Sequence, residues 1–134
     1  SECLVGSEMC IRDRIKDVYP DLQVIAGTAP DCLQTEERSE NPTHAFIGGS
    51  SGRLKEILDV LYEKNHAMRI VINCITLETV TEAMNAIRDF SLTDVDIVQL
   101  SAARSKSIGR YHMMMGENPI YIITIQAHKK ENFV

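Results

Sequence analysis

Short apolar runs alternate with longer amphipathic segments along this chain, and this alternation limits the fold more than any other feature of the sequence. Five runs are rich in Val, Ile and other strand-favouring residues, and the first two stop at glycines. They cover residues 22–27, 44–49, 68–74, 94–101 and 118–127. We therefore expect five strands.

Two segments between these runs carry apolar residues at helical spacing. In a helix, residues at this spacing lie on one face, which would pack against the core. Thr79 and Glu82 have the spacing of a capping box, although Thr76 is an equally good N-cap for the second helix. The apolar positions are Leu54, Ile57, Leu58 and Leu61 in the first segment, and Val80, Ala83, Met84 and Ile87 in the second.

Strands separated by amphipathic helices predict an α/β fold. Right-handed crossovers would give a mainly parallel sheet that is covered on both faces. The last two strands differ, because the segment between them is polar and methionine-rich and shows no clear helix. We expect that segment to be a loop, and we expect those two strands to pair antiparallel as a hairpin at the edge of the sheet.

Composition excludes several classes of protein. A length of 134 residues suits one domain, and a net charge of −5 argues against a surface devoted to nucleic acid. No apolar stretch approaches the roughly 20 residues that cross a bilayer, and we expect a cytoplasmic protein. The cysteines are scattered without a C-x-x-C pair, so we expect neither a metal site nor a disulfide framework.

Residues 1–14, SECLVGSEMCIRDR, differ in composition from the rest of the chain. The stretch looks like a translated sequencing-adapter tract, so we expect a non-native segment and exclude it from the fold. A frayed helix over 11–18 is the alternative interpretation. On the first interpretation the domain covers residues 15–134.

The segment FIGGSSG places two glycines and two serines between the second strand and the first helix. Ligands of open α/β sheets bind at the carboxyl ends of strands, where the next helix begins. Gly48 and Gly49 allow close backbone approach, while Ser50 or Ser51 can either cap the helix or bind a ligand. The spacing fits neither a Walker loop nor a dinucleotide fingerprint. A simple capped turn therefore stays open beside a ligand loop.

Two other segments are candidate sites. Gly27, Thr28 and Ala29 bring small side chains to the end of the first strand, where they can admit a flat ring or simply begin a turn at Pro30 and a short helix. Residues 101–119 carry Arg104, Lys106 and Arg110 with no acid before Glu117, which favours an anionic partner. Tyr111 and Met113 to Met115 can supply an apolar wall, and a solvated loop remains the alternative.

The segments FIGGSSGRLKEIL, RIVINCITLETV and VQLSAARSKSIGRYHMMMGENPIYIIT resemble one known family. It is the decarboxylating precorrin-6B methyltransferases of cobalamin biosynthesis, which act at carbon 15. The resemblance runs from about Val24 to Ala127. It implies a Rossmann-like class I methyltransferase sheet whose last strand is antiparallel, with S-adenosyl-L-methionine as cofactor and an anionic tetrapyrrole, a precorrin, as substrate.

The resemblance also implies roles for particular positions. Gly27, Thr28 and Ala29 would lie beside the adenine, although the family has Asp where this chain has Thr28. Gly48 and Gly49 would bind the cofactor near its methyl-donor end. The substrate would lie near Ser50, Ser51, Arg104, Arg110 and Tyr111. No residue is assigned as a general acid or base.

The front of the chain departs from the family. Family members begin with a strand and a glycine-rich loop, followed by a second strand that ends in an acid, and the sequence shows neither. We expect a fold truncated at the N-terminus, of which residues 15–134 form the C-terminal part, and weak or no cofactor binding by this chain alone. Two alternatives stay open: a class I methyltransferase for another small molecule, and a non-catalytic anion-binding module. A homo-oligomer is possible on either view.

Overall fold

The computed structural model describes residues 3–5, 23–25, 27–34, 42–50 and 52–126. It divides the chain into unit 1, residues 1–41, and unit 2, residues 42–134. Each unit is described by itself. Most of segment 1–14 and all of the alternative helix over 11–18 lie outside the described residues. No described helix has the length and apolar character that crossing a membrane requires.

The described residues of unit 1 form two short strands and one short helix. Strand β1 (Cys3–Val5) pairs in parallel with β2 (Gln23–Ile25), so a strand lies inside the segment that the sequence led us to exclude. Helix α2 (Asp31–Gln34) follows a turn at Pro30, where the Leu33 N–H donates to the Pro30 carbonyl at 2.9 Å. The predicted turn and short helix after β2 are therefore confirmed.

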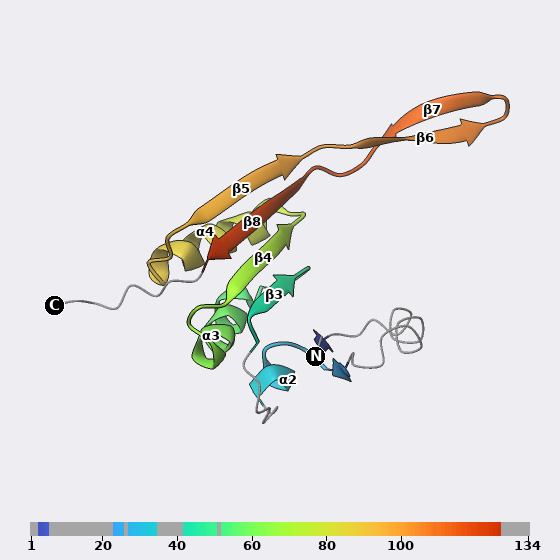
Figure 1. The fold of residues 1–134 in the computed structure, drawn as a ribbon. Coiled ribbons are helices and arrows are strands. Elements are labelled where there is room, and N and C mark those ends of the chain that lie inside the picture. The colour runs from blue at the N-terminus through green and yellow to red at the C-terminus, as the bar shows by residue number, and fades with distance from the viewer. Residues whose placement is uncertain (1–2, 6–22, 26, 35–41, 51, 127–134) are drawn as a thin grey trace. The chain divides into compact units, whose positions relative to one another are not determined.

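Unit 2 is built on a four-stranded mixed sheet in the order β3-β4-β8-β5. Its strands are β3 (His44–Ile47), β4 (Arg69–Cys74), β5 (Val95–Leu100) and β8 (Ile120–Gln126). β3 and β4 are parallel, whereas β8 runs antiparallel to both of its neighbours, β4 and β5. The arrows of β3, β4 and β5 consequently point the same way (Figure 1). The antiparallel last strand is confirmed, but β8 lies inside the sheet and β5 forms the edge.

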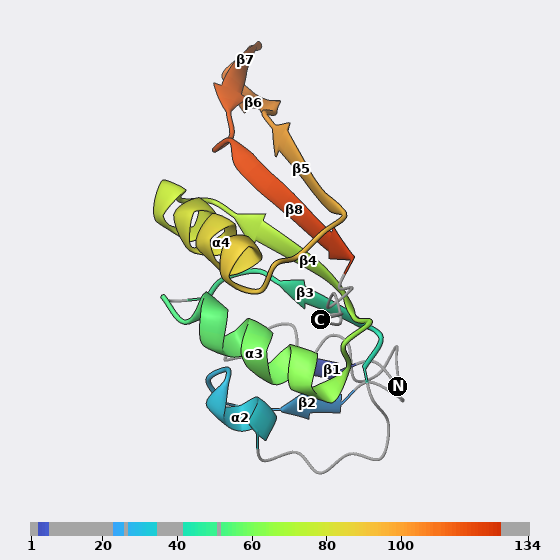
Figure 2. The ribbon, with the colours of Figure 1, turned by 90° about the vertical axis from the view of Figure 1, so that its left-hand side faces the viewer.

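Helices α3 (Leu54–Lys64) and α4 (Leu77–Asp89) cover one face of this sheet, as Figure 2 shows. Their predicted apolar faces are largely confirmed, although Met84 is exposed. The core lies between the helices and alternate strand residues, which point to one face of a sheet. Its fully buried members include Leu54, Leu58, Ile70, Ile72, Ala83, Ile123 and Ile125.

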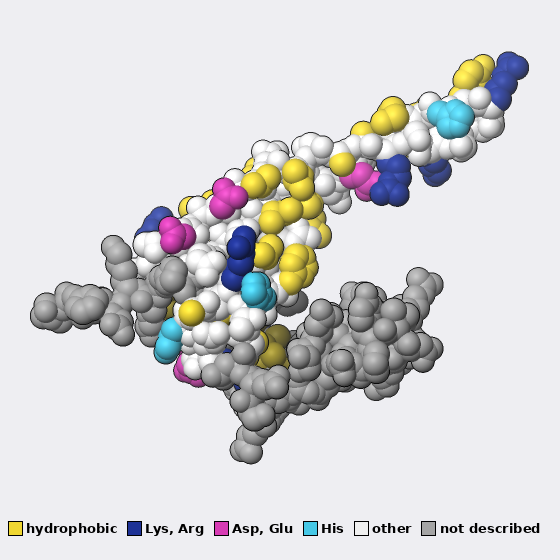
Figure 3. Space-filling model, viewed as in Figure 1, with side chains coloured by type: hydrophobic (Ala, Val, Ile, Leu, Met, Phe, Trp, Pro, Cys, Tyr) yellow, Lys and Arg dark blue, Asp and Glu magenta, His cyan; other side chains and the backbone are white. Residues whose placement is uncertain are grey.

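The opposite face of the sheet is open in unit 2, which corrects the expectation of cover on both faces. Phe46 is 71% exposed, and Val98 and Leu100 on the same face are also exposed. The register places Val98 beside Ile122, and Ile122 beside Asn73. Figure 3 shows hydrophobic side chains on this face. Both described helices of unit 2 lie on the other side, because the crossovers β3–α3–β4 and β4–α4–β5 step across the sheet in the same direction and share one hand.

Residues 101–119 form a β-hairpin, so the expectation of a loop was wrong. Strand β6 (Ala103–Ile108) pairs antiparallel with β7 (Tyr111–Gly116), and the hairpin extends the β5–β8 pair beyond the sheet (Figure 1). Every residue of both strands is exposed. Cross-strand pairing therefore holds these strands, without burial on either face.

The cap of α4 is Thr76, whose side chain accepts a hydrogen bond from the Thr79 N–H at 3.2 Å. Of the two predicted caps, Thr76 is therefore correct and Thr79 is wrong. We expect Thr76→Ala to lower the free energy of unfolding by about 1 kcal/mol, because an N–H at the start of the helix loses its acceptor. Urea denaturation followed by circular dichroism measures the change.

Thr81→Ala is the matched control for that variant. The Thr81 hydroxyl donates to the Leu77 carbonyl within the same helix, and alanine is the better helix former, so this substitution should be neutral or slightly stabilising. Equal losses in the two variants would contradict the assignment of the cap.

Candidate functional site

The loops after β3, β4 and β5 meet at one edge of the sheet in unit 2. Because these strands run in the same direction, their carboxyl ends share that edge. The structure therefore brings the loop after β3, which holds Gly48 and Gly49, to the same edge as the base of the hairpin that carries Arg104. Gly27, Thr28 and Ala29 belong to unit 1.

The loop between β3 and α3 exposes its two glycines. An ideal Cβ on Gly49 would meet no atom within 4 Å, and one on Gly48 would meet only the Phe46 ring at 3.6 Å. Open space therefore lies directly over this backbone. Gly52 has a φ of +80°, a conformation that L side chains rarely adopt, so the loop needs glycine there as well.

Ser50 behaves differently from its neighbours because its side chain turns inward. Only 7% of Ser50 is exposed, and its hydroxyl donates to Oε2 of Glu82 at 3.4 Å. The N-cap of α3 is Arg53, which makes no side-chain capping bond, and the Arg53 guanidinium pairs with Glu56 at 2.8 Å. Ser50 is thus not the helix cap, and Ser51 lies outside the described residues.

The end of β4 adds polar groups that the sequence analysis did not select. Cys74 is fully buried, and burial, followed by the negative charge of Glu82, raises the pKa of its thiol. Oδ1 of Asn73 is buried and makes no hydrogen bond among the described residues. Glu82 was considered only as part of a capping box with Thr79, and the Thr76 cap leaves its carboxylate available to the loop.

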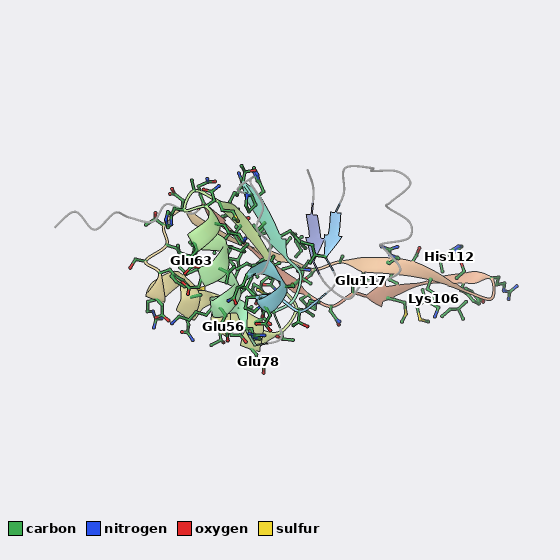
Figure 4. The ribbon with its side chains drawn as sticks, turned by 90° about the horizontal axis from the view of Figure 1, so that it is seen from below. Glu56, Glu63, Glu78, Lys106, His112 and Glu117 are labelled. Atoms are coloured by element: carbon green, nitrogen blue, oxygen red, sulfur yellow. The ribbon has the colours of Figure 1, made fainter. Side chains whose placement is uncertain are left out.

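The hairpin presents a mixed basic and apolar face. Directly paired residues share a face of an antiparallel ribbon, so Arg104 lies beside Met115 and Lys106 beside Met113. Ser107 and His112 pair on the other face, and Figure 4 shows Lys106 and His112 on opposite sides of the hairpin. The three predicted methionines are exposed on this ribbon, Met113 and Met115 on the face of Lys106 and Arg104, and Met114 on the other face.

The predicted cations of the hairpin have few acidic partners. Nε of Arg104 lies 3.6 Å from Oε1 of Glu117, at the base of the ribbon, and both side chains are largely exposed. At the tip, the Arg110 guanidinium carbon lies 5.6 Å from the centroid of the Tyr111 ring, a cation–π distance. These groups can attract carboxylates, and Tyr111 and the methionines can contact a flat apolar ring.

In unit 1, the segment after β2 forms a tight turn. Gly27 has a φ of +150°, and a Cβ placed there would come 2.8 Å from the Cβ of Cys32. The Cys32 N–H donates to the Thr28 carbonyl at 3.1 Å. Thr28 is exposed and Ala29 is half-buried. Gly27 is thus required by the turn itself, and the exposed Thr28 side chain is open to a ligand.

Comparison with known proteins identifies relatives of this chain. A family model described as a precorrin methyltransferase domain matches residues 8–127. A probable cobalt-precorrin-6B C(15)-methyltransferase (decarboxylating) of Methanothermobacter thermautotrophicus is 41% identical over 104 residues, which are 77% of this chain and 52% of that protein. A protein with the same description from Saccharolobus solfataricus is 35% identical over 108 residues, 80% of this chain and 53% of its own length.

Comparison of the fold with solved structures leads to the same family. The crystal structure of a precorrin-6y C5,15-methyltransferase from Geobacter metallireducens superposes with a TM-score of 0.78 at 30% identity, and the match covers 92% of this chain and 67% of that one. The Rossmann-like methyltransferase fold is thereby confirmed, as is the resemblance that the motifs indicated. The chain spans about half the length of the curated relatives that it matches. It belongs to the precorrin methyltransferase domain family.

Proposed function

We propose that this chain is part of an enzyme of cobalamin biosynthesis. The enzyme would transfer a methyl group from S-adenosyl-L-methionine to a ring carbon of a precorrin and remove carbon dioxide from an acetate side chain. The match of residues 8–127 to the precorrin methyltransferase domain carries the proposal. Curated relatives named as decarboxylating C(15)-methyltransferases support the reaction, which we propose for the whole protein because this chain spans about half their length.

The carboxyl edge of unit 2 is suited to hold part of the cofactor. The open space over Gly49 lets a ligand reach the backbone without meeting a side chain, which is what Gly48 and Gly49 would supply. In unit 1, Gly27, Thr28 and Ala29 would contact the adenine. S-adenosyl-L-methionine would contribute an electrophilic methyl group carried on a sulfonium.

The hairpin is suited to hold the substrate. Precorrins carry several acetate and propionate groups, and Arg104 and Arg110 offer planar donors for carboxylates. The ring of Tyr111 would contact the edge of the macrocycle. Ser50 would act by holding the glycine loop, because its hydroxyl donates to Glu82, and Ser51 would bind the substrate.

No acid–base pair is required of this chain. An electron-rich ring carbon can attack a sulfonium methyl group directly, so the residues would accelerate the reaction chiefly by holding donor and acceptor in line.

Self-association is part of the proposal. A two-stranded ribbon with no buried face is marginal by itself in water. Met114 is exposed on the face opposite Arg104 and Tyr111, and a second copy of the chain that packed against that face would bury it and leave the substrate face open. The exposed ribbon therefore supports a homo-oligomer.

A methyl-transfer assay tests the proposed reaction. The chain is incubated with S-adenosyl-L-methionine and cobalt-precorrin-6B, alone and together with the half of the Methanothermobacter relative that it does not match. We expect little turnover by the chain alone and turnover in the mixture. Mass spectrometry should show a product that has gained one methyl group and lost one carboxyl group.

Two other outcomes would replace the proposal. Methyl transfer to a different acceptor but not to the precorrin would indicate a class I methyltransferase with another substrate. Binding of the precorrin without turnover in either sample would favour the non-catalytic anion-binding module.

A further inference from the structure

Glu82 connects helix α4 to the glycine loop, although the two are far apart in the sequence. One carboxylate oxygen, Oε2, accepts a hydrogen bond from the Ser50 hydroxyl at 3.4 Å. The other, Oε1, lies 3.9 Å from the point that a Cβ on Gly52 would occupy. The carboxylate thus lies against the loop on both sides of residue 51.

The packing of α4 determines where Glu82 lies. The neighbouring Ala83 is fully buried, and Ala86 is 1% exposed one turn later. These small side chains allow α4 to lie close to the rest of the core, and the Thr76 cap sets the first turn of the helix. Glu82 is therefore half-buried at a defined position and is not a solvated surface acid.

The buried thiol of Cys74 strengthens this arrangement. Burial and the charge of Glu82 both raise the pKa of Cys74, so the thiol stays neutral near pH 7. A neutral thiol brings no second negative charge to the carboxylate.

The loop itself needs such an anchor. Glycine has more conformational freedom than other residues, and Gly48, Gly49 and Gly52 all lie within five positions. Ordering a flexible loop when a ligand binds costs affinity, whereas a loop that is already ordered avoids that cost.

We propose that Glu82 is a positioning residue that holds residues 48–50 and Gly52 in their ligand-accepting conformation through Ser50. The inference rests on the proposed function for the role of the loop in binding the cofactor. It adds that a carboxylate of α4 keeps the loop in one conformation. This carboxylate need not touch the cofactor or the substrate.

Amide hydrogen exchange tests this without any ligand. In Glu82→Ala we expect the Arg53 amide, which donates to the Ser50 carbonyl at 2.9 Å, to exchange about tenfold faster than in the unchanged chain, because the hydrogen bond that holds the Ser50 side chain is lost. Ser50→Ala should have the same effect, and the double variant should add little to either. Glu82→Gln should restore much of the protection, because its amide oxygen can accept the same hydrogen bond.

Glu78→Ala is the matched control. Glu78 lies one turn earlier on α4, is exposed, and points away from the sheet in Figure 4. This variant should leave exchange of the Arg53 amide unchanged. If Glu82→Ala left exchange of the Arg53 amide unchanged, or raised exchange equally at Arg53 and in β4, Glu82 would have no positioning role.

Calorimetric titration with S-adenosylhomocysteine separates this inference from the proposed function. Where the unchanged chain binds the ligand, Glu82→Ala should weaken binding about tenfold while Glu78→Ala does not. Unchanged affinity in Glu82→Ala would overturn the positioning role. A chain that bound no ligand would count against cofactor binding by this chain alone, while the exchange result would still decide the role of Glu82.

Discussion

Replacing Ile123 with alanine should lower the free energy of unfolding by about 3 kcal/mol, the cost of removing a fully buried isoleucine from a packed core. Ile123 lies in β8, between Ile72 of β4 and Ile97 of β5. Because β8 is the strand that joins β5 to the rest of the sheet, the cavity would weaken both strand pairs. Urea denaturation followed by circular dichroism measures the loss.

Ile122→Ala separates burial from strand pairing. Ile122 precedes Ile123 in β8, pairs with the same two strands, and lies half-buried on the open face. It loses the same atoms from a site that already contacts water, so the expected cost is about 1 kcal/mol. Equal losses in the two variants would mean that the two faces of the sheet are equally buried in solution, contrary to the structure.

The difference in burial between the two faces of the sheet also explains which elements the sequence could predict. β3, β4, β8 and both long helices were recognised because burial of one face leaves an apolar pattern with the period of the element. β5 was recognised from its apolar residues alone, because every residue of this strand except Val95 is exposed. The sequence also indicated cover on both faces of the sheet. In β4, Val71 and Ile72 are both apolar, yet Ile72 is buried under the helices whereas Val71 lies on the open face. A continuous apolar run therefore predicts a strand, but it does not show whether another element covers each face of that strand.

The hairpin was missed because its strands have no buried face. Arg104, Ser105 and Lys106 follow one another in β6 without an apolar alternation. One local feature could have predicted it. Gly109, with a φ of +60°, is the first of two residues between Ile108 and Tyr111, and glycine at that position is typical of tight two-residue hairpin turns. Turn chemistry predicts this hairpin better than hydrophobic period does.

The site was predicted in part for a similar reason. Strand direction alone brings the loop of Gly48 and the hairpin of Arg104 to one edge of the sheet, and the order of strands and helices was sufficient to expect it. Glu82 was missed because its spacing from Thr79 suggested a cap. Two residues in contact across 32 positions, Ser50 and Glu82, leave no periodic pattern, so only the three-dimensional structure reveals them.

The cations of the hairpin should dominate binding of a tetrapyrrole with many carboxylates. Changing Arg104, Lys106 and Arg110 together to Gln should weaken binding of uroporphyrin, a stable porphyrin that bears acetate and propionate groups, about 30-fold at low salt. The estimate takes somewhat less than 1 kcal/mol for each exposed charge pair. Titration followed by porphyrin fluorescence measures it. Added salt should weaken binding by the unchanged chain and have much less effect on the triple variant, because screening acts on the removed charges.

Two variants distinguish the hairpin from the general charge of the protein. Changing Lys55, Arg69 and Arg88 to Gln removes the same charge from α3, β4 and α4 and should leave affinity nearly unchanged. Glu117→Gln should act in the opposite direction and strengthen binding, because it removes the acid that lies 3.6 Å from Arg104. If both triple variants lost affinity equally, the porphyrin would be responding to net charge, and the hairpin would not be the substrate surface.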